Sequence, residues 1–195
     1  MTGSPPRPGE PGPGEPRPGE PRPGEPGAAG APRIRQSVRA LIVDTDDRVL
    51  LVRFEFPDAT VWALPGGGVE PDEAPLDALQ RELAEELGLV GAVVGPHVWD
   101  RLHLVRFSHG RSTGGLPPRW DGQRDRIHLV RTPPFEPSPQ LSWDELRAER
   151  LHEIRWWTLP EVRAHAGRFA PRRLADHLAT LLRHGPPPAP VDTGE

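Results

Sequence analysis

Three glutamates have a spacing that could create a metal-binding site on one helix. Glu82, Glu85 and Glu86 stand at positions i, i+3 and i+4, which places their carboxylates on one face of an α-helix. Three like charges on one face repel each other, and a hard divalent cation that prefers oxygen ligands removes the repulsion. Taken alone, such a cluster is more often an ordinary solvated helix face. The residues around it therefore decide the interpretation.

The residues that precede the cluster add a flexible turn and two more charged groups. Residues 66–68 are all glycine, so the backbone can approach a metal ion or a phosphate more closely than a side chain would allow. Glu73 stands where the helix is expected to begin, a position at which the helix dipole favours a carboxylate. Arg81 lies four residues before Glu85, close enough on a helix to hold a carboxylate. Together these features favour a metal site.

From Gly67 to Leu89 the chain resembles the complete signature of the Nudix hydrolase family. The pattern is Gly67, five residues, Glu73, seven residues, and then Arg-Glu-Leu-Ala-Glu-Glu-Leu-Gly-Leu over residues 81–89. The resemblance implies a hydrolase that catalyses attack of water on phosphorus in a phosphoanhydride. The implied substrate is a nucleoside diphosphate linked to another group, such as a nucleotide sugar, an ADP-ribose-like compound or a nucleoside triphosphate. The implied cofactor is Mg2+, with Mn2+ as the alternative ion.

The resemblance also implies roles for individual residues of the signature. The metal ligands would be the three glutamates and the Gly67 carbonyl, and Arg81 would orient a carboxylate. In many members of the family a glutamate outside the signature acts as a base or as an extra ligand. Its position varies, so Glu145, Glu149 and Glu153 are all candidates here. Of these we favour Glu149 and Glu153, although each is also expected as an ordinary surface carboxylate.

The sequence says less about the groups that bind the rest of the substrate. Arginines can contact phosphates and tryptophans can stack on a base, and the candidates are Arg53, Trp62, Arg101 and Arg126. The competing interpretation is a solvated arginine or a tryptophan packed in the core. Signatures of the NADH, dinucleoside-polyphosphate and coenzyme A subfamilies are missing, and the chain contains no tyrosine. The expected substrate class therefore stays general.

Hydrophobic patterns predict an α+β domain, and the resemblance specifies a Nudix-like α/β/α sandwich with a mixed β-sheet. The predicted strands are 37–43, 48–54, 61–64, 92–107, 126–132 and 154–158. The predicted helices are 73–87, 142–150 and 171–184, and residues 108–125 are expected to form a long loop. Along the first helix one apolar stripe is expected, formed by Leu76, Leu79, Leu83 and Leu87.

Composition divides the chain into three parts. Residues 1–32 repeat Pro-Gly-Glu every five residues and are predicted to be a disordered tail, because they contain almost nothing apolar to bury. Residues 33–184 are predicted to be the hydrolase domain. Residues 185–195 are predicted to be a second, shorter disordered tail.

The bulk composition excludes several kinds of chemistry. The chain has no lysine and no cysteine, which excludes a Schiff-base lysine, a thiol nucleophile and a cysteine-ligated zinc. The net charge is -4, so no nucleic-acid partner is expected. Without a signal peptide or a membrane-spanning run, the expectation is a cytoplasmic enzyme whose partner is a small nucleotide. A homodimer is left open.

Two other classes of function compete with the enzyme. The first is a module that binds a nucleotide without cleaving it. The intact acidic cluster argues against this class, because a pure binder need not keep every carboxylate. The second is a protein-interaction role of the Pro-Gly-Glu tail, which is compatible with catalysis by the domain.

Overall fold

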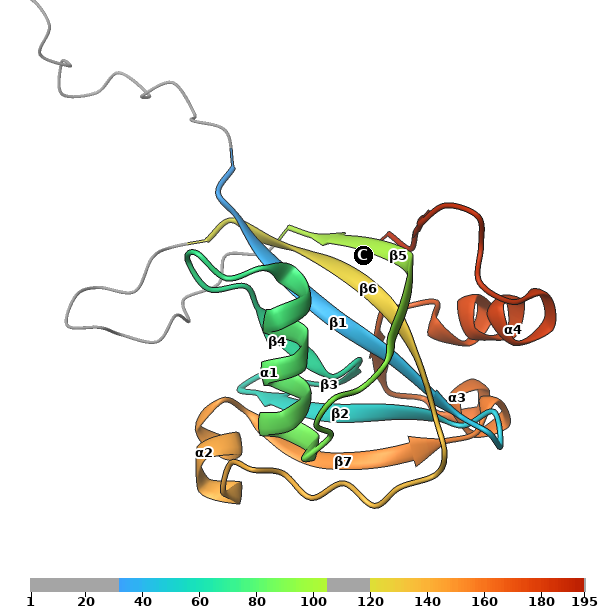
Figure 1. The fold of residues 1–195 in the computed structure, drawn as a ribbon, viewed down its shortest axis with the longest axis horizontal. Helices are drawn as coiled ribbons and strands as arrows, with labels where there is room; N and C mark the ends of the chain where they lie inside the picture. Colours follow the sequence, from blue (N-terminus) through green and yellow to red (C-terminus); the bar gives the residue numbers. More distant parts are fainter. Residues whose placement is uncertain (1–31, 105–119, 195) are drawn as a thin grey trace, which may run out of the picture. The chain divides into compact units, whose positions relative to one another are not determined.

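The computed structural model describes residues 32–104 and 120–194, and these form a mixed β-sheet with helices on both faces (Figure 1). The expected α+β class with a Nudix-like sandwich is confirmed. The strands of this described part are β1 (Ile34–Asp44), β2 (Val49–Phe56), β3 (Ala59–Ala63), β4 (Gly66–Gly68), β5 (Val94–His103), β6 (Gly122–Thr132), β7 (Leu151–Trp157), β8 (Arg168–Ala170) and β9 (Val191–Asp192). The helices are α1 (Pro75–Leu87), α2 (Trp143–Ala148), α3 (Leu159–Ala164) and α4 (Leu174–His184). The predictions for residues 1–31 and 105–119 lie outside the described residues.

Strand β1 is the central strand and has different partners along its two edges. The sheet order is β8-β3-β2-β1-β6-β5-β9, with β4 paired to β1 and β7 paired to β2. On one edge β1 pairs with β6 in parallel along its whole length. On the other edge β4 pairs with the beginning of β1, from Ser37 to Arg39, and β2 meets only its end, where Val43 lies opposite Val49. Two strands therefore share one edge of β1 and diverge from each other.

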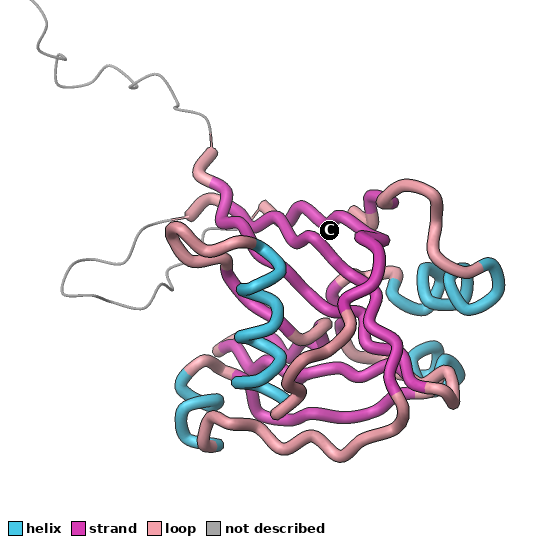
Figure 2. The backbone as a smooth tube through the Cα atoms, in the orientation of Figure 1, coloured by secondary structure: helices cyan, strands magenta, loops and turns pink. Residues whose placement is uncertain are grey.

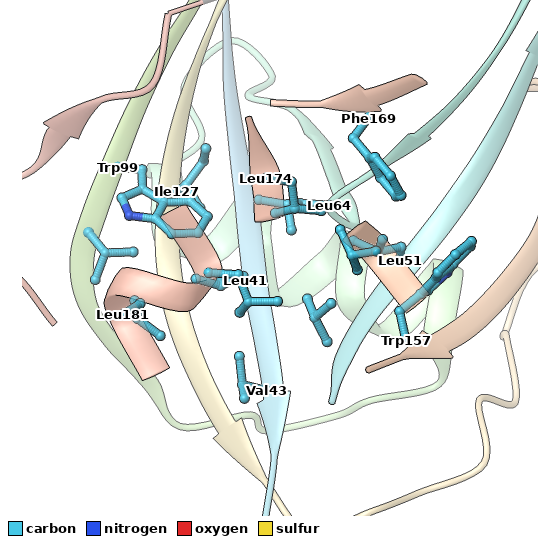
Figure 3. Close-up of a cluster of buried hydrophobic side chains, with 14 of the residues drawn as sticks. Leu41, Val43, Leu51, Leu64, Trp99, Ile127, Trp157, Phe169, Leu174 and Leu181 are labelled. Atoms are coloured by element: carbon cyan, nitrogen blue, oxygen red, sulfur yellow. The ribbon is translucent and has the colours of Figure 1, made fainter. Parts of the chain in front are cut away.

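The two faces of β1 pack into two separate cores. Because side chains alternate along a strand, Val38, Ala40 and Ile42 face α1, whereas Leu41 and Val43 face α4. On the first face the buried leucines of α1 are Leu79, Leu83 and Leu87. Figure 3 shows the second core, where Leu41, Val43 and Leu51 lie near Leu174 and Leu181 of α4. Each fully buried side chain of this kind stabilises the fold by about 1.5–3 kcal/mol.

Helix α1 begins and ends where local chemistry requires it. Pro75 opens the helix, two residues after the predicted start, because its fixed φ suits the first helical turn. At the other end Gly88 adopts a left-handed φ of 69°, and its N–H donates to the Ala84 carbonyl at 3.0 Å. Leu76 is 46% exposed. The expectation that the whole stripe packs in the core is therefore wrong for Leu76, which lies in the first helical turn, whereas Ala78 is buried beside the other leucines.

Three segments differ from the sequence prediction. Strand β6 begins at Gly122, inside the predicted loop, because it pairs with β1 from Ile34 onward. Residues 185–195 were predicted to be a free tail, but β9 pairs in parallel with β5, and Thr193 is buried and donates its N–H to the Asp100 carbonyl at 2.8 Å. Helix α3 was not predicted, although Thr158 and Glu161 form a capping box that the sequence displays. In Figure 2, α3 and α4 lie beside the strands, at the right of the view.

Replacing Gly88 by alanine is expected to destabilise the fold. A Cβ at this position would overlap the Ser138 carbonyl oxygen, and the left-handed φ adds strain. We expect the free energy of unfolding to fall by about 2–4 kcal/mol, measured by urea denaturation. Gly91 is the matched control, because its φ is also 69° but nothing lies within 4 Å of the added Cβ. An equal loss in both variants would show that the contact with Ser138 is unimportant.

Candidate active site

The signature glutamates lie along one flank of α1, beside the free edge of β4. The buried leucines of α1 hold the helix against the sheet and leave this flank facing the glycine strand. Glu86 is buried, and its Oε2 accepts a hydrogen bond from the Gly66 N–H at 2.9 Å. The side chain of Glu82 is 12% exposed, and that of Glu85 is 28% exposed. The cluster thus extends from the protein interior to its surface.

Glu86 is a buried carboxyl group whose charged form the protein alone stabilises poorly. Burial raises the pKa of Glu86 to about 8, and the neighbouring charge of Glu82 contributes in the same direction. Burial also raises the pKa of Glu82, although its hydrogen bond from Arg81 opposes that rise. Carboxylate oxygens that are removed from water and crowded together suit a hard divalent cation. Such an ion would favour the charged forms of both side chains.

Arg81 connects the cluster to the loop before the helix. Its Nε donates to Glu73 Oε1 at 2.9 Å, and its Nη2 donates to Glu73 Oε2 at 3.1 Å. Its Nη1 donates to Glu82 Oε1 at 2.8 Å and to Glu85 Oε2 at 3.4 Å. The hydrogen bond from Arg81 lowers the pKa of Glu73. The predicted orienting role of Arg81 therefore has a geometric basis.

The carboxylates do not by themselves form a complete ion cage. Within residues 32–104 and 120–194, no three acidic or histidine side chains are gathered closely enough to hold a metal ion. Arg81 Nη1 bridges Glu82 and Glu85, so part of the space between these two carboxylates is taken by a cation of the protein itself. Binding of a metal ion there requires small side-chain movements.

Successive glycines of β4 direct their backbone groups to opposite sides of the strand. A Cβ on Gly67 would overlap the Glu82 carboxylate, so Gly67 is needed because it has no side chain. The Gly66 N–H and the Gly68 carbonyl both bond to α1 side chains. The register that pairs Gly67 with Val38 turns the Gly67 backbone groups toward β1 instead. The expectation of a Gly67 carbonyl ligand is therefore corrected, since this carbonyl faces the neighbouring strand.

Two arginines of β1, which the sequence analysis missed, start from the face of β1 opposite α1, and their charges act on the glutamates of the site. Arg39 donates to the Leu64 carbonyl at 3.1 Å, and its charge lowers the pKa values of Glu82 and Glu86 against the effect of burial. Arg35 lies on the same side of β1, and its charge interacts with Glu82. Their alternate positions in a strand were visible in the sequence. The pairing of β1 with the glycine strand, which brings both arginines near the site, was not visible in the sequence.

Asp125 on β6 balances part of this positive charge. Burial opposes its ionisation, but Arg39 and Arg101 outweigh burial, and the pKa of Asp125 is lowered. Arg101 Nη1 donates to Asp125 Oδ2 at 3.0 Å, and Arg39 Nε lies 3.7 Å from Asp125 Oδ1. Gln123 donates to the same carboxylate at 2.5 Å. Asp125 on β6 therefore forms ion pairs with Arg39 on β1 and Arg101 on β5.

The three candidates for the base have different surroundings. Glu145 accepts hydrogen bonds from Ser142 in the predicted capping box at the start of α2. Glu153 Oε2 lies 2.9 Å from Arg53 Nε on the neighbouring strand. Glu149, at the end of α2, is exposed, and its negative charge contributes to the raised pKa of Glu86. Of the three, Glu149 is the one whose charge acts on the buried carboxylate.

The four predicted substrate residues are not brought together. Arg53 is paired with Glu55 and Glu153, and Arg101 with Asp125. Trp62 is buried, with its ring 4.9 Å from that of Trp157, so the core interpretation holds for it. Arg126 lines a cavity of about 480 Å3 away from the acidic cluster; the other lining residues are Pro75, Leu76, His97, Asp100, Arg124 and His128. None of the signature glutamates lines this cavity, whose other walls come from β5 and β6.

Comparison with known proteins assigns the family. The NUDIX domain model matches residues 33–178. Nudix hydrolase 25 of Arabidopsis thaliana is 30% identical over 136 residues, which cover 67% of this chain and 75% of that protein. An RNA pyrophosphohydrolase of Halorhodospira halophila is 36% identical over 116 residues, covering 52% of this chain and 63% of that protein. The solution structure of the E. coli ORF135 protein superposes with a TM-score of 0.50 at 27% identity, covering 84% of this chain and 100% of that chain.

The chain belongs to the Nudix family. The expectation of a Nudix-type hydrolase that acts on phosphoanhydride bonds is confirmed at the level of this class. Within the described ranges no helix has both the length and the apolar character needed to cross a bilayer.

Replacing Asp125 by asparagine is expected to destabilise the protein in a pH-dependent way. The change leaves Arg39 and Arg101 without their buried counter-charge, which costs about 3–5 kcal/mol at pH 7. Because the pKa of Asp125 is lowered by folding, its contribution is present above the unfolded value of about 3.9 and is lost as the pH falls through the folded value. The difference from wild type in urea denaturation should therefore shrink below about pH 4.

Asp46→Asn is the control, since the side chain of Asp46 is 66% exposed and lies 3.7 Å from Arg48. Its effect should stay below about 1 kcal/mol at every pH. A difference for Asp125→Asn that does not depend on pH would contradict the assignment.

Proposed function

We propose that the protein is a Mg2+-dependent Nudix hydrolase of a nucleoside diphosphate linked to another group. The substrates considered are nucleotide sugars, ADP-ribose-like compounds and nucleoside triphosphates. Water attacks one phosphorus atom of the phosphoanhydride, the bond to the bridging oxygen breaks, and two phosphate-bearing products leave. The proposal rests mainly on Glu86, a buried carboxyl group beside Glu82. The pKa of Glu86 is raised to about 8, and its hydrogen-bond partner is the Gly66 N–H. A divalent cation is the group that such a pair of carboxylates lacks.

Several residues of this chain would act together in that reaction. Glu82, Glu85 and Glu86 would hold Mg2+, or Mn2+ in its place. The Gly66 carbonyl is the candidate main-chain ligand, because the trans peptide directs it away from the Gly67 N–H and thus away from β1. The ion would neutralise charge on the phosphate and lower the pKa of water. Arg81 keeps Glu82 and Glu85 in position from the side of the loop.

Glu149 is proposed as the base that accepts a proton from the attacking water. It is exposed to solvent and acts electrostatically on Glu86. Its backbone is held at the end of α2, because the Glu149 N–H donates to the Leu146 carbonyl at 3.0 Å and to the Glu145 carbonyl at 3.2 Å. Glu153 is the weaker candidate, since Arg53 already occupies its carboxylate.

The relatives support the reaction class more than the substrate. One relative is named an RNA pyrophosphohydrolase, and its RNA substrate is a property of that protein. A test of function therefore needs a panel that contains nucleotide sugars, ADP-ribose, nucleoside triphosphates and a 5′-triphosphorylated oligoribonucleotide. Phosphate, pyrophosphate and monophosphate release would be measured with and without Mg2+. Binding without turnover of any member would favour the nucleotide-binding module over the enzyme. Cytoplasmic location and a homodimer remain predictions.

Removing a carboxylate of the cluster is expected to abolish most turnover. Glu85→Gln and Glu86→Gln should each lower kcat by at least ~100-fold, because loss of a metal ligand removes several kcal/mol of charge stabilisation. The assay is steady-state hydrolysis of the best substrate of the panel in Mg2+. Asp77→Asn is the control, since Asp77 is an exposed carboxylate on the same helix. Wild-type rates in both glutamine variants would remove the assignment.

Two further variants distinguish the candidate bases. Glu149→Gln should lower kcat/KM by about 100-fold, because a general base contributes about 10²–10⁴-fold. Glu153→Gln loses only an exposed ion pair with Arg53 and should stay within about threefold of wild type. The reverse order of effects would assign the base to Glu153.

A further inference from the structure

Arg35 has no direct ion pair in the described part of the chain, although the charges of Glu82, Asp125 and Glu149 act on it from a distance. It is half-buried on β1, and in the described part of the chain no carboxylate lies within ion-pair distance of it. Its guanidinium donates to Gln123 Oε1 over a long 3.4 Å. Burial lowers the pKa of Arg35, and the positive charge of Arg39 lowers it further. Arg39 and Arg101, in contrast, share the carboxylate of Asp125.

Arg35 lies directly against the glycine strand of the site. A Cβ on Gly68 would overlap its guanidinium, so the side chain occupies the place where β4 has no side chain of its own. The register explains this contact, because Ser37 pairs with Gly68 and Arg35 precedes Ser37 by two residues on the same face of β1. The charges of Glu82 and Glu149 act on Arg35 and raise its pKa, opposing the effect of burial. Arg35 and Glu82 therefore lie on opposite faces of β4, near enough for their charges to interact across this short strand.

A cation at the cluster would change the electrostatic surroundings of Arg35. The negative charge that now partly compensates Arg35 would be taken up by the ion. The guanidinium would then have an unmet charge and free N–H donors. A planar guanidinium binds phosphate oxygens through two parallel hydrogen bonds. A phosphoryl group is thus the complementary ligand.

We propose that Arg35 binds the second phosphoryl group of the substrate, the one adjacent to the group held at the acidic cluster. This inference rests on the proposed function. It makes Arg35 a specificity-determining residue that selects a linked diphosphate over a phosphate monoester. The competing explanation is a structural one, in which Arg35 only links β1 to Gln123 on β6.

The test compares Arg35→Gln and Arg35→Lys with a matched control. Arg124→Gln removes another arginine without a carboxylate partner in the described ranges, but Arg124 is exposed and lines the cavity beside β5 and β6. Binding of methylenediphosphonate, a linked diphosphate that is not hydrolysed, and of inorganic phosphate is measured by calorimetry in Mg2+. Steady-state kinetics on the best panel substrate and thermal unfolding complete the set.

Arg35→Gln should weaken methylenediphosphonate binding by about 10–100-fold and raise KM by a similar factor, as expected for a charge-assisted hydrogen bond. Phosphate binding and kcat should change by less than about threefold. Arg35→Lys should recover part of the affinity, because it keeps the charge but loses the paired donors. Arg124→Gln should match the wild type.

Unchanged binding of methylenediphosphonate by Arg35→Gln would overturn the proposal. Equal weakening of phosphate and methylenediphosphonate would also overturn it, because Arg35 would then shape the cluster rather than bind a second group. If Arg35→Gln does not fold, wild-type binding of methylenediphosphonate by Arg35→Lys would overturn the proposal in the same way. If the wild type hydrolyses no substrate of the panel, the proposed function fails, and the binding comparison still decides the role of Arg35.

Discussion

The burial of Glu82 and Glu86 on one helix is the physical constraint on which the site depends. Both carboxylates come from one helix, and both have lost much of the water that would screen them. Burying an unpaired carboxylate is costly. The protein opposes this cost with the Gly66 N–H, with Arg81 and with the more distant charge of Arg39. The buried leucines of α1 prevent the helix from moving away, since each one stabilises the packed position by about 1.5–3 kcal/mol.

The divided edge of β1 explains how positive charge reaches this cluster. The beginning of β1 pairs with the glycine strand, whereas its end pairs with β2. The polar residues Arg35 and Arg39 therefore lie where β4 carries no side chains, and Leu41 and Val43 continue the same face into the core. One strand thus serves the site at its beginning and the stability of the fold at its end.

The opposite edge of the sheet is closed by the end of the chain. Strand β9 pairs with β5, and Thr193 bonds to the Asp100 carbonyl through its N–H and its hydroxyl. Covering an edge strand removes unpaired backbone groups that would otherwise attract another chain. Strand β5 also carries Arg101, which holds Asp125 next to Arg39. The pairing of β9 with β5 therefore helps to keep Arg101 beside Asp125, and this ion pair balances charge near the site.

The amino-acid sequence by itself determined what depends on neighbours along the chain. The positions of the glutamates on α1, the glycine that ends this helix and the hairpin of β1 and β2 all follow from local spacing and local backbone preference. The tertiary structure decided everything that depends on which segments meet: Arg35 and Arg39 lying close enough for their charges to act on the cluster, Glu149 rather than Glu153 acting on Glu86, and β9 pairing with β5. It also placed Trp62 in the core and turned the Gly67 carbonyl toward β1. The physical reason is that helical periodicity is encoded in neighbouring residues, whereas strand register and burial arise from contacts between residues far apart in the chain.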